Sequence, residues 1–237
     1  MKTAILTGAN GNLGRDFINT LIANNYAIYA VDKNIDQLNS EDNITPIKLD
    51  ITNENEVKDF YQKIDKLDLI VNNAGIGVFS SFEERTAEEF RLVTDVNLLG
   101  TFLMAQGAIK IMKSQNHGKI VNIASIYGVK SSDYRIYGSS GRNNSEVYSA
   151  TKAGIIQLTK YMATHFGKYN IQTNSISPGG IYNGQSEDFV ENYKNKTPLG
   201  RMGKTADICN ALNFLCSEKT DYINGQNIVV DGGFLAW

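Results

Sequence analysis

The stretch Thr7-Gly8-Ala9-Asn10-Gly11-Asn12-Leu13-Gly14 joins a short apolar segment, residues 4–7, to an amphipathic segment, residues 12–24. The first segment is expected to form a strand and the second a helix, because its apolar residues recur at helical spacing. A glycine-rich turn here lets the backbone N–H groups and the dipole of the helix face a pyrophosphate. The stretch therefore favours a dinucleotide site, although any tight strand-to-helix turn favours glycine.

Short apolar segments alternate with helical segments along the rest of the chain. Further strands are expected at residues 27–31, 45–49, 67–71, 118–124, 171–176 and 227–230, and further helices at residues 53–64, 86–113, 146–166 and 205–217. This alternation predicts an α/β fold with a doubly wound parallel sheet between two helical layers, in the order α/β/α. We expect one domain over residues 1–237, with polar loops at Lys130–Ser145 and Tyr182–Gly203.

Composition narrows the classes of partner. Of the 237 residues, 42% are hydrophobic and 20% are charged, which is enough for a packed core. The formal net charge of −2 gives no reason to expect nucleic acid or an anionic membrane as a partner. No run of about 20 apolar residues and no signal-peptide pattern is recognised, so a cytoplasmic protein is expected.

The cysteines and histidines do not form a metal-binding pattern. Cys209 and Cys216 supply two thiols, too few for a tetrahedral site, and are expected to be free and at least half-buried. His117 and His165 have no acidic or cysteine partners at ligand spacing and are expected at the surface. The sequence therefore predicts no metal site.

Polar residues follow several of the expected strands. Asp32 ends the second strand, Asp50 follows the third, and Asn72-Asn73-Ala74-Gly75 follows the fourth. In an open parallel sheet, ligands bind beyond the carboxyl ends of the strands, so these residues should share an edge with the glycine-rich turn. A carboxylate at Asp32 suits ribose hydroxyls and repels a 2′-phosphate, which favours NAD(H) over NADP(H). The neighbouring Lys33 weakens that preference, so NADP(H) is left open.

Tyr148 and Lys152 are four residues apart in an expected helix and so lie on one face. A lysine ammonium beside a phenol is expected to lower the tyrosine pKa, and such a phenol serves as an acid or base. Ser125 lies just past the fifth strand, where its hydroxyl can hydrogen-bond a carbonyl that gains charge. These three residues predict proton chemistry beside a bound dinucleotide.

In these motifs the chain resembles the short-chain dehydrogenase/reductase family, in its compact single-domain branch. The resemblance covers essentially the whole chain and adds Asn97, Pro178-Gly179, Pro198-Leu199-Gly200-Arg201 and Val230-Asp231-Gly232-Gly233. It implies a Rossmann-type fold with Tyr148 as general acid/base and Ser125 polarising the substrate carbonyl. It also implies that Lys152 holds the nicotinamide ribose and tunes Tyr148, while Asn97 organises a water that relays protons.

The residues expected to bind the cofactor combine the motifs above with their neighbours. They are Gly8, Asn10, Gly11, Asn12, Leu13, Gly14, Asp32, Asp50, Ile51, Asn73, Ala74, Gly75, Tyr148, Lys152, Pro178, Gly179 and Ile181.

Three departures from the family pattern stand out. Asn12 occupies a position where the compact branch usually has glycine, a spacing closer to the branch that acts on nucleotide sugars; Asn tolerates left-handed backbone conformations. Ser125 and Tyr148 are separated by 22 residues, more than usual, and the extra material is the polar segment Lys130–Ser145. The family's threonine after Pro178-Gly179 has no clear match.

The leading functional hypothesis is an NAD(P)-dependent oxidoreductase acting on a polar small molecule, such as a sugar or sugar-acid precursor of surface polysaccharide. Its substrate contacts are expected from Tyr127, Arg135, Arg142 and Tyr182. One alternative is a nucleotide-sugar epimerase or dehydratase, which the glycine spacing favours and the chain length disfavours. Another is a non-catalytic dinucleotide-binding protein.

Two further expectations concern larger-scale organisation. The segment 130–145 leaves the sheet after Ser125 and returns at Tyr148, so it is expected to close over the substrate. The long helices are expected to pair in a homotetramer or homodimer, as in compact family members. The surface residues expected for this pairing are Leu92, Leu99, Phe102, Met104, Leu158 and Met162.

Overall fold

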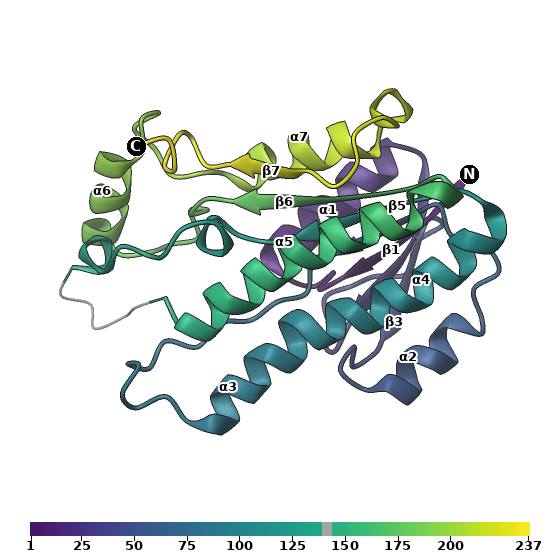
Figure 1. Cartoon of the computed structure of the whole chain (residues 1–237), viewed down its shortest axis with the longest axis horizontal. Helices are drawn as coiled ribbons and strands as arrows, with labels where there is room; N and C mark the ends of the chain where they lie inside the picture. Colours follow the sequence, from purple (N-terminus) through teal and green to yellow (C-terminus); the bar gives the residue numbers. More distant parts are fainter. Residues whose placement is uncertain (139–143) are drawn as a thin grey trace.

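The computed structural model describes residues 1–138 and 144–237 of the chain. Within them, seven strands form one parallel sheet in the order β3-β2-β1-β4-β5-β6-β7 (Figure 1). The strands are β1 (Lys2–Thr7), β2 (Tyr26–Asp32), β3 (Ile44–Lys48), β4 (Leu69–Asn72), β5 (Gly118–Ile123), β6 (Ile171–Pro178) and β7 (Asn227–Val230). The α-helices are α1 (Asn12–Ala23), α2 (Glu54–Tyr61), α3 (Ala87–Thr94), α4 (Thr101–Gln115), α5 (Glu146–Phe166), α6 (Glu187–Lys196) and α7 (Thr205–Cys216). The expected doubly wound α/β fold is confirmed.

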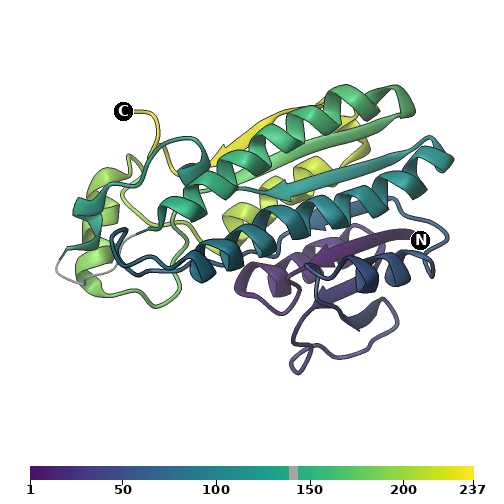
Figure 2. The same ribbon diagram turned by 60° about the horizontal axis from the view of Figure 1, so that its bottom comes forward.

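Helices cover both faces of the sheet, and alternate residues of each strand serve the two layers (Figures 1 and 2). On β1, Ala4 and Leu6 pack with α1 and α7, whereas Ile5 packs with α2 and α4 on the other face. All three are fully buried. This pattern of strands buried on both sides is typical of a parallel sheet.

The chain reverses direction across the sheet at β1. It runs outward from β1 to β2 and β3, then returns to β4 on the other side of β1. Such a reversal leaves a crevice beyond the carboxyl ends of the two central strands. The glycine-rich turn after β1 and Asn73 after β4 meet at this crevice.

The expected helix at 86–113 is one continuous helical run with an irregular centre. Between α3 and α4 the backbone adopts a π-helix, Asp95–Gly100, which contains Asn97. Thr86 caps α3 in a capping box with Glu89, as its sequence favours. The run Ala87–Gln115 is long and apolar enough to cross a membrane by length and composition, but half of its most apolar window is buried inside the protein. Buried helices of packed domains share this property.

The two expected polar loops contain ordered structure. Helix α6 lies within 182–203, and a short 3-10 helix, Tyr134–Tyr137, lies within 130–145. The two segments pack together in a third hydrophobic cluster whose buried members are Ile126, Ile136, Tyr193, Met202 and Phe234. Asp133 accepts hydrogen bonds from Lys196 of α6 and from Arg135. The expectation that both segments are loops is therefore wrong for these parts.

Several expected surface residues have different environments. Leu92, Leu99 and Phe102 are exposed, but Met104 and Met162 are buried and pack beneath the helices that carry them. His165 is exposed and stacks on Tyr161, while His117 is partly exposed. Both cysteines are free; Cys209 is half-buried and Cys216 is buried, as expected.

Candidate active site

Two glycines make the turn after β1 possible. Gly8 has a φ of +65°, and a Cβ atom there would lie 2.8 Å from the Cα of Ala74. A Cβ atom on Gly14 would lie 2.1 Å from the carbonyl oxygen of Gly8. Gly11 precedes α1 as its N-cap, and neither a capping side chain nor an acidic residue engages the first turn. The first N–H groups of α1 therefore remain available to an anion such as a pyrophosphate.

Asn12 replaces the usual glycine without unusual backbone geometry. It is the first residue of α1, and it is exposed. Among the described non-glycine residues, only Asn25, Asn116 and Asn170 have positive φ. The left-handed conformation considered for Asn12 is therefore not adopted, because an ordinary helical residue fits at this position.

Asn73 fastens the glycine-rich turn to the end of β4. Its side-chain amide donates to the carbonyl oxygens of Thr7 (3.1 Å) and Gly8 (3.0 Å). In return, the hydroxyl of buried Thr7 accepts from the backbone N–H groups of Asn73 and Ala74. These bonds fix the two walls of the crevice before any ligand arrives.

Two acidic residues, Asp32 and Asp50, lie at the end of the crevice beside β2 and β3. Asp32 accepts from the N–H groups of Asn10 and Asn34, both at 3.0 Å, and so braces the glycine-rich turn against the end of β2. Lys33 lies 2.7 Å from Asp50. Hydrogen bonds from Lys33 and Thr52 lower the pKa of Asp50 to about 2, so the pair is ionised at neutral pH. The ammonium of Lys33 is thus already partnered.

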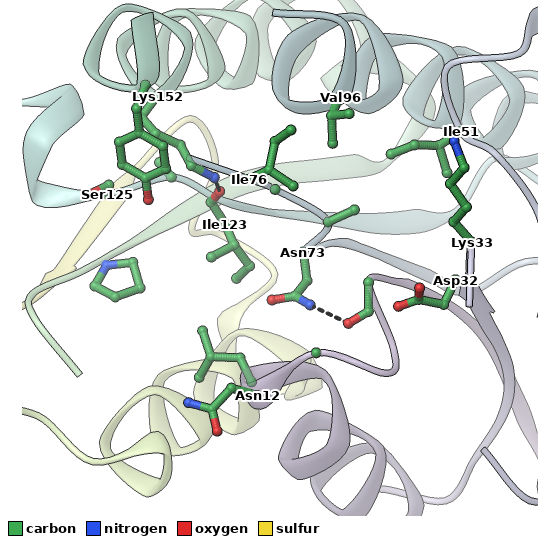
Figure 3. Close-up of a pocket in the computed structure, with 18 of the residues that line it drawn as sticks. Asn12, Asp32, Lys33, Ile51, Asn73, Ile76, Val96, Ile123, Ser125 and Lys152 are labelled. Carbon is green, nitrogen blue, oxygen red and sulfur yellow. Dashed lines mark hydrogen bonds between the residues drawn. The ribbon is translucent and has the colours of Figure 1, made fainter. Parts of the chain in front are cut away.

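A cavity of about 660 Å³ runs from the glycine-rich turn to Ser125, Tyr148 and Lys152. Figure 3 shows Asp32 and Lys33 toward one side of it, and Ser125 and Lys152 toward the other. Of the residues expected to bind the cofactor, only Asn10 and Gly14 are not in its lining. Asn10 instead donates its backbone N–H to Asp32, and Gly14 packs against the turn. The long cavity, the uncapped helix and the carboxylate of Asp32 together fit a dinucleotide.

Lys152 is buried at the inner end of this cavity. Its ammonium donates to the carbonyl oxygen of Ile123 at 2.8 Å, and 3% of the residue is exposed. Burial lowers the pKa of Lys152 to about 8. The ammonium group retains two further donors that can face hydroxyl groups of a ligand.

Asn97 is fully buried beside Lys152, and its side chain is fully engaged. Its carbonyl oxygen accepts from the N–H of Ile76 at 2.8 Å. Its amide donates to the carbonyl oxygen of Ile76 and to the hydroxyl of Thr151 in α5. Asn97 therefore holds the loop after β4 against the helix that carries Lys152.

Tyr148 and Ser125 form the polar end of the site. Ser125 is buried and its hydroxyl accepts from the N–H of Tyr127 at 3.1 Å. Burial raises the pKa of Tyr148, and a hydrogen bond with Ser125 acts in the opposite direction. The expectation that Lys152 lowers this pKa is wrong here, because the ammonium lies 5.6 Å from the ring centroid and is bonded to Ile123. The phenol is therefore protonated at neutral pH, ready to act as an acid.

The depressed pKa of Lys152 predicts a pH-dependent stability difference. A buried lysine that titrates near pH 8 rather than at its usual 10.5 destabilises the fold while it is protonated. This cost is present in full below pH 8 and disappears as the pH approaches 10.5. Relative to Lys152→Met, the parent should therefore gain about 3 kcal/mol in the free energy of unfolding over that range. Urea unfolding of both proteins at pH 7.5, 8.5 and 9.5 measures it, and a constant difference would contradict the buried-charge account.

A second cavity of about 360 Å³ continues past Ser125 and Tyr148. Its apolar wall includes Ile76, Val78, Phe79, Ile126 and Phe189. Its polar groups are Ser125, Tyr127, Tyr137, Asn144, Tyr148, Gln185 and Ser186. Among the described residues that line it, none carries a formal charge at neutral pH. The position of this cavity beyond the hydroxyls of Ser125 and Tyr148 makes it the candidate substrate pocket.

The expected substrate residues have different positions relative to this pocket. Tyr127 lines it, and its phenol forms a hydrogen bond with Tyr137. Arg135 is exposed, pairs with Asp133 at 2.7 Å and is not in the lining. Tyr182 is also exposed and outside the lining. Arg142 lies outside the described residues.

Sequence reasoning missed several lining residues, above all Phe79, Tyr137, Gln185 and Phe189. Tyr134 and Tyr137 are aromatic residues within a polar segment, and this was an available signal for Tyr137. For metals, the described residues contain no group of three or more His, Cys, Asp or Glu side chains that could hold an ion.

The fold and the site define a dinucleotide-dependent oxidoreductase with a tyrosine–lysine pair at the reacting end. A family model described as Enoyl-(Acyl carrier protein) reductase matches residues 19–235. A 3-oxoacyl-[acyl-carrier-protein] reductase from Aquifex aeolicus (strain VF5) is 35% identical over 98% of this chain and 87% of that protein.

Two solved structures of dehydrogenases are also similar to this chain. A short chain dehydrogenase from Leptospira borgpetersenii serovar Hardjo-bovis with bound NAD+ is 41% identical, with a TM-score of 0.93 over 98% of this chain and 92% of that chain. A gluconate 5-dehydrogenase from Burkholderia cenocepacia J2315 in complex with NADP and tartrate is 26% identical, with a TM-score of 0.88 over 100% and 96%. The chain belongs to the short-chain dehydrogenase/reductase family. It is an NAD(P)-dependent oxidoreductase that acts on CH–OH or keto groups.

Proposed function

We propose that the protein is an NAD(H)-preferring alcohol dehydrogenase or carbonyl reductase for a small, uncharged substrate that carries both hydroxyl and apolar parts. The observation that carries this proposal is the second cavity, whose described lining combines neutral hydrogen-bonding side chains with an apolar wall. A carboxylate or phosphate buried there would find no arginine or lysine among those residues. A hydroxylated ketone or alcohol would find partners for its polar groups and cover for its carbon atoms.

The roles of the chain's own residues follow from their positions. A reduced nicotinamide held in the first cavity would supply the hydride for the carbonyl carbon. Ser125 donates a hydrogen bond to the carbonyl oxygen, and Tyr148 donates its proton to that oxygen as the alkoxide forms. Lys152 would hold the ribose of the cofactor through the donors that its bond to Ile123 leaves free. Asn97 holds the loop after β4, beside the water path to Lys152 that the family resemblance implies.

The proposed substrate class keeps one part of the sequence-based hypothesis, a sugar, and disfavours another part, a sugar acid. A sugar-like polyol agrees with the tyrosines and amides of the pocket. A sugar acid agrees less well, because Arg135 is paired with Asp133 outside the lining and the described lining is uncharged. The relatives named for 3-oxoacyl thioesters and for gluconate define the two competing substrate classes that an assay should include.

A panel assay separates these classes. Oxidation of NADH is followed by absorbance with neutral hydroxyketones, keto sugar acids and 3-oxoacyl thioesters at matched concentrations. We expect the highest kcat/KM for a neutral hydroxyketone, and about a tenfold loss for it in Tyr137→Phe, because one hydrogen-bonding group of the pocket is removed. Tyr134→Phe is the matched control, since Tyr134 is exposed on the same 3-10 helix. A clear preference for keto acids or acyl thioesters would contradict the proposed substrate class.

The alternative of a nucleotide-sugar epimerase has no support from the comparisons. The matched relative and solved structures are compact dehydrogenases and reductases that share nearly their full length with this chain. Two free thiols suit a reducing compartment, in line with the proposed cytoplasmic location.

We also propose that the chain forms a homotetramer or homodimer. Phe90, Leu92, Leu99 and Phe102 are exposed along the run from α3 to α4, and Tyr161 is exposed on α5. Apolar side chains gathered on long helices are typical of a self-complementary interface. Light scattering at micromolar protein should give a multiple of 26.2 kDa, and Phe102→Glu should lower it. A monomeric mass for the parent would contradict the proposal.

A further inference from the structure

A buried arginine lies outside the residues used above. The side chain of Arg85 is only 5% exposed. Its guanidinium contacts the hydroxyl and, at 2.7 Å, the carbonyl oxygen of Ser80. It also reaches Glu146 at 3.3 Å and Glu89 at 3.4 Å. We refer to Arg85, Ser80, Glu89 and Glu146 as the Arg85 cluster.

The members of the Arg85 cluster come from three different segments. Ser80 and Arg85 belong to the loop between β4 and α3, and the same loop supplies Gly77, Val78 and Phe79 to the substrate pocket. Glu89 lies in the first turn of α3. Glu146 lies in the first turn of α5, two residues before Tyr148. The guanidinium therefore links one wall of the pocket to the start of the catalytic helix.

The chemistry of the cluster requires arginine. Only a guanidinium presents donors in a planar fork that can meet several oxygens at once. Ser80 also bonds both carboxylate oxygens of Glu89, so the loop and α3 are held from two directions. A lysine would keep the positive charge but could not satisfy all of these acceptors from one position. Charge alone would then not maintain the geometry.

We propose that Arg85 is a positioning residue that holds the Phe79 wall of the substrate pocket at a fixed distance from Tyr148. It touches neither the expected cofactor residues nor the reacting atoms, so it acts through the loop and through α5. The expected effect on substrate binding rests on the proposed function, whereas the expected effect on amide hydrogen exchange does not. Loss of the fork should loosen substrate binding and leave cofactor binding unchanged.

The kinetic experiment uses two variants and a control. Arg85→Lys and Glu146→Gln should each raise KM for the carbonyl substrate about tenfold, with a smaller change in kcat and NADH affinity unchanged within about twofold. Arg91→Lys is the matched control, because Arg91 pairs with Glu88 on the exposed side of α3. In a Phe79→Ala background, Arg85→Lys should add little, since the wall that it positions is already gone.

A second measurement separates failure of this proposal from failure of the proposed function. Amide hydrogen exchange should accelerate in residues 76–86 and 146–150 of Arg85→Lys and Glu146→Gln, and not in Arg91→Lys. This readout requires no substrate. Unchanged exchange in both segments overturns the coupling. Faster exchange with unchanged KM, or an equal rise in KM and in the NADH dissociation constant, overturns the positioning role.

Discussion

Replacing Tyr148 by phenylalanine should lower turnover by about 10²–10⁴-fold, the usual contribution of general acid–base catalysis. The variant should keep its fold, because the ring still fills the same place at the start of α5. It should also keep most of its affinity for NADH, because Tyr148 is one of many residues that line the first cavity and its hydroxyl contacts Ser125. Initial rates of NADH oxidation and a calorimetric titration with NADH measure the two effects separately.

The direction of the Tyr148 pKa gives this expectation its physical basis. Burial raises that pKa, so the hydroxyl carries its proton at neutral pH. A protonated phenol is the form that can neutralise the alkoxide created by hydride addition. Tyr182→Phe serves as the control, because the Tyr182 phenol is exposed and outside both cavities. A Tyr148→Phe variant with the same turnover as the parent would show that Tyr148 is not the general acid.

The second large effect concerns the choice of cofactor. We expect NAD(H) to bind about 10²–10³-fold more tightly than NADP(H), because Asp32 lies where a 2′-phosphate would place like charge. Lys33 does not offset this repulsion, since Asp50 holds its ammonium at 2.7 Å. Asp32→Ser should bring the two dissociation constants to within about tenfold of each other. Adding Asp50→Asn should favour NADP(H) further by releasing Lys33.

The ratio of dissociation constants is the reliable readout for these variants. Asp32 also accepts hydrogen bonds from Asn10 and Asn34, so its loss will loosen the turn. A looser turn weakens the binding of both cofactors alike, so the ratio of their dissociation constants does not contain this effect. Asp59→Ser on the exposed side of α2 controls for net charge. Equal dissociation constants in the parent, or a preference for NADP(H), would contradict the assignment of Asp32.

The sequence predicted the parts of the molecule that depend on local pattern. The bounds of α5 agree to the residue, because Ser145 caps its start and the amphipathic run is long. The glycine-rich turn was recognisable from the spacing of its glycines. The fold requires glycine there, because a Cβ atom at Gly8 or Gly14 would collide with nearby backbone. Helix α6 was missed, since only three of its ten residues, Phe189, Val190 and Tyr193, are large and apolar.

The features that depend on packing between distant segments were not predictable. The π-helix around Asn97 lies inside a run of ordinary helix-forming sequence. The pKa of Tyr148 reflects burial that no pattern of charges along the chain reveals. Likewise, Tyr137 reaches the pocket because Ile136 beside it is buried in the cluster shared with α6 and the C-terminus. In each case the deciding neighbours are far away in the sequence.

Hydride transfer itself is the most direct test of the account. NADH carrying deuterium at the transferable position would be incubated with the protein and neutral hydroxyketones, and the products analysed by mass spectrometry. The account predicts deuterium on the carbinol carbon of the product with the parent and Tyr182→Phe, and about 10²–10⁴-fold slower labelling with Tyr148→Phe. Tight NADH binding without labelled product, or equal labelling rates in Tyr148→Phe and the parent, would contradict it.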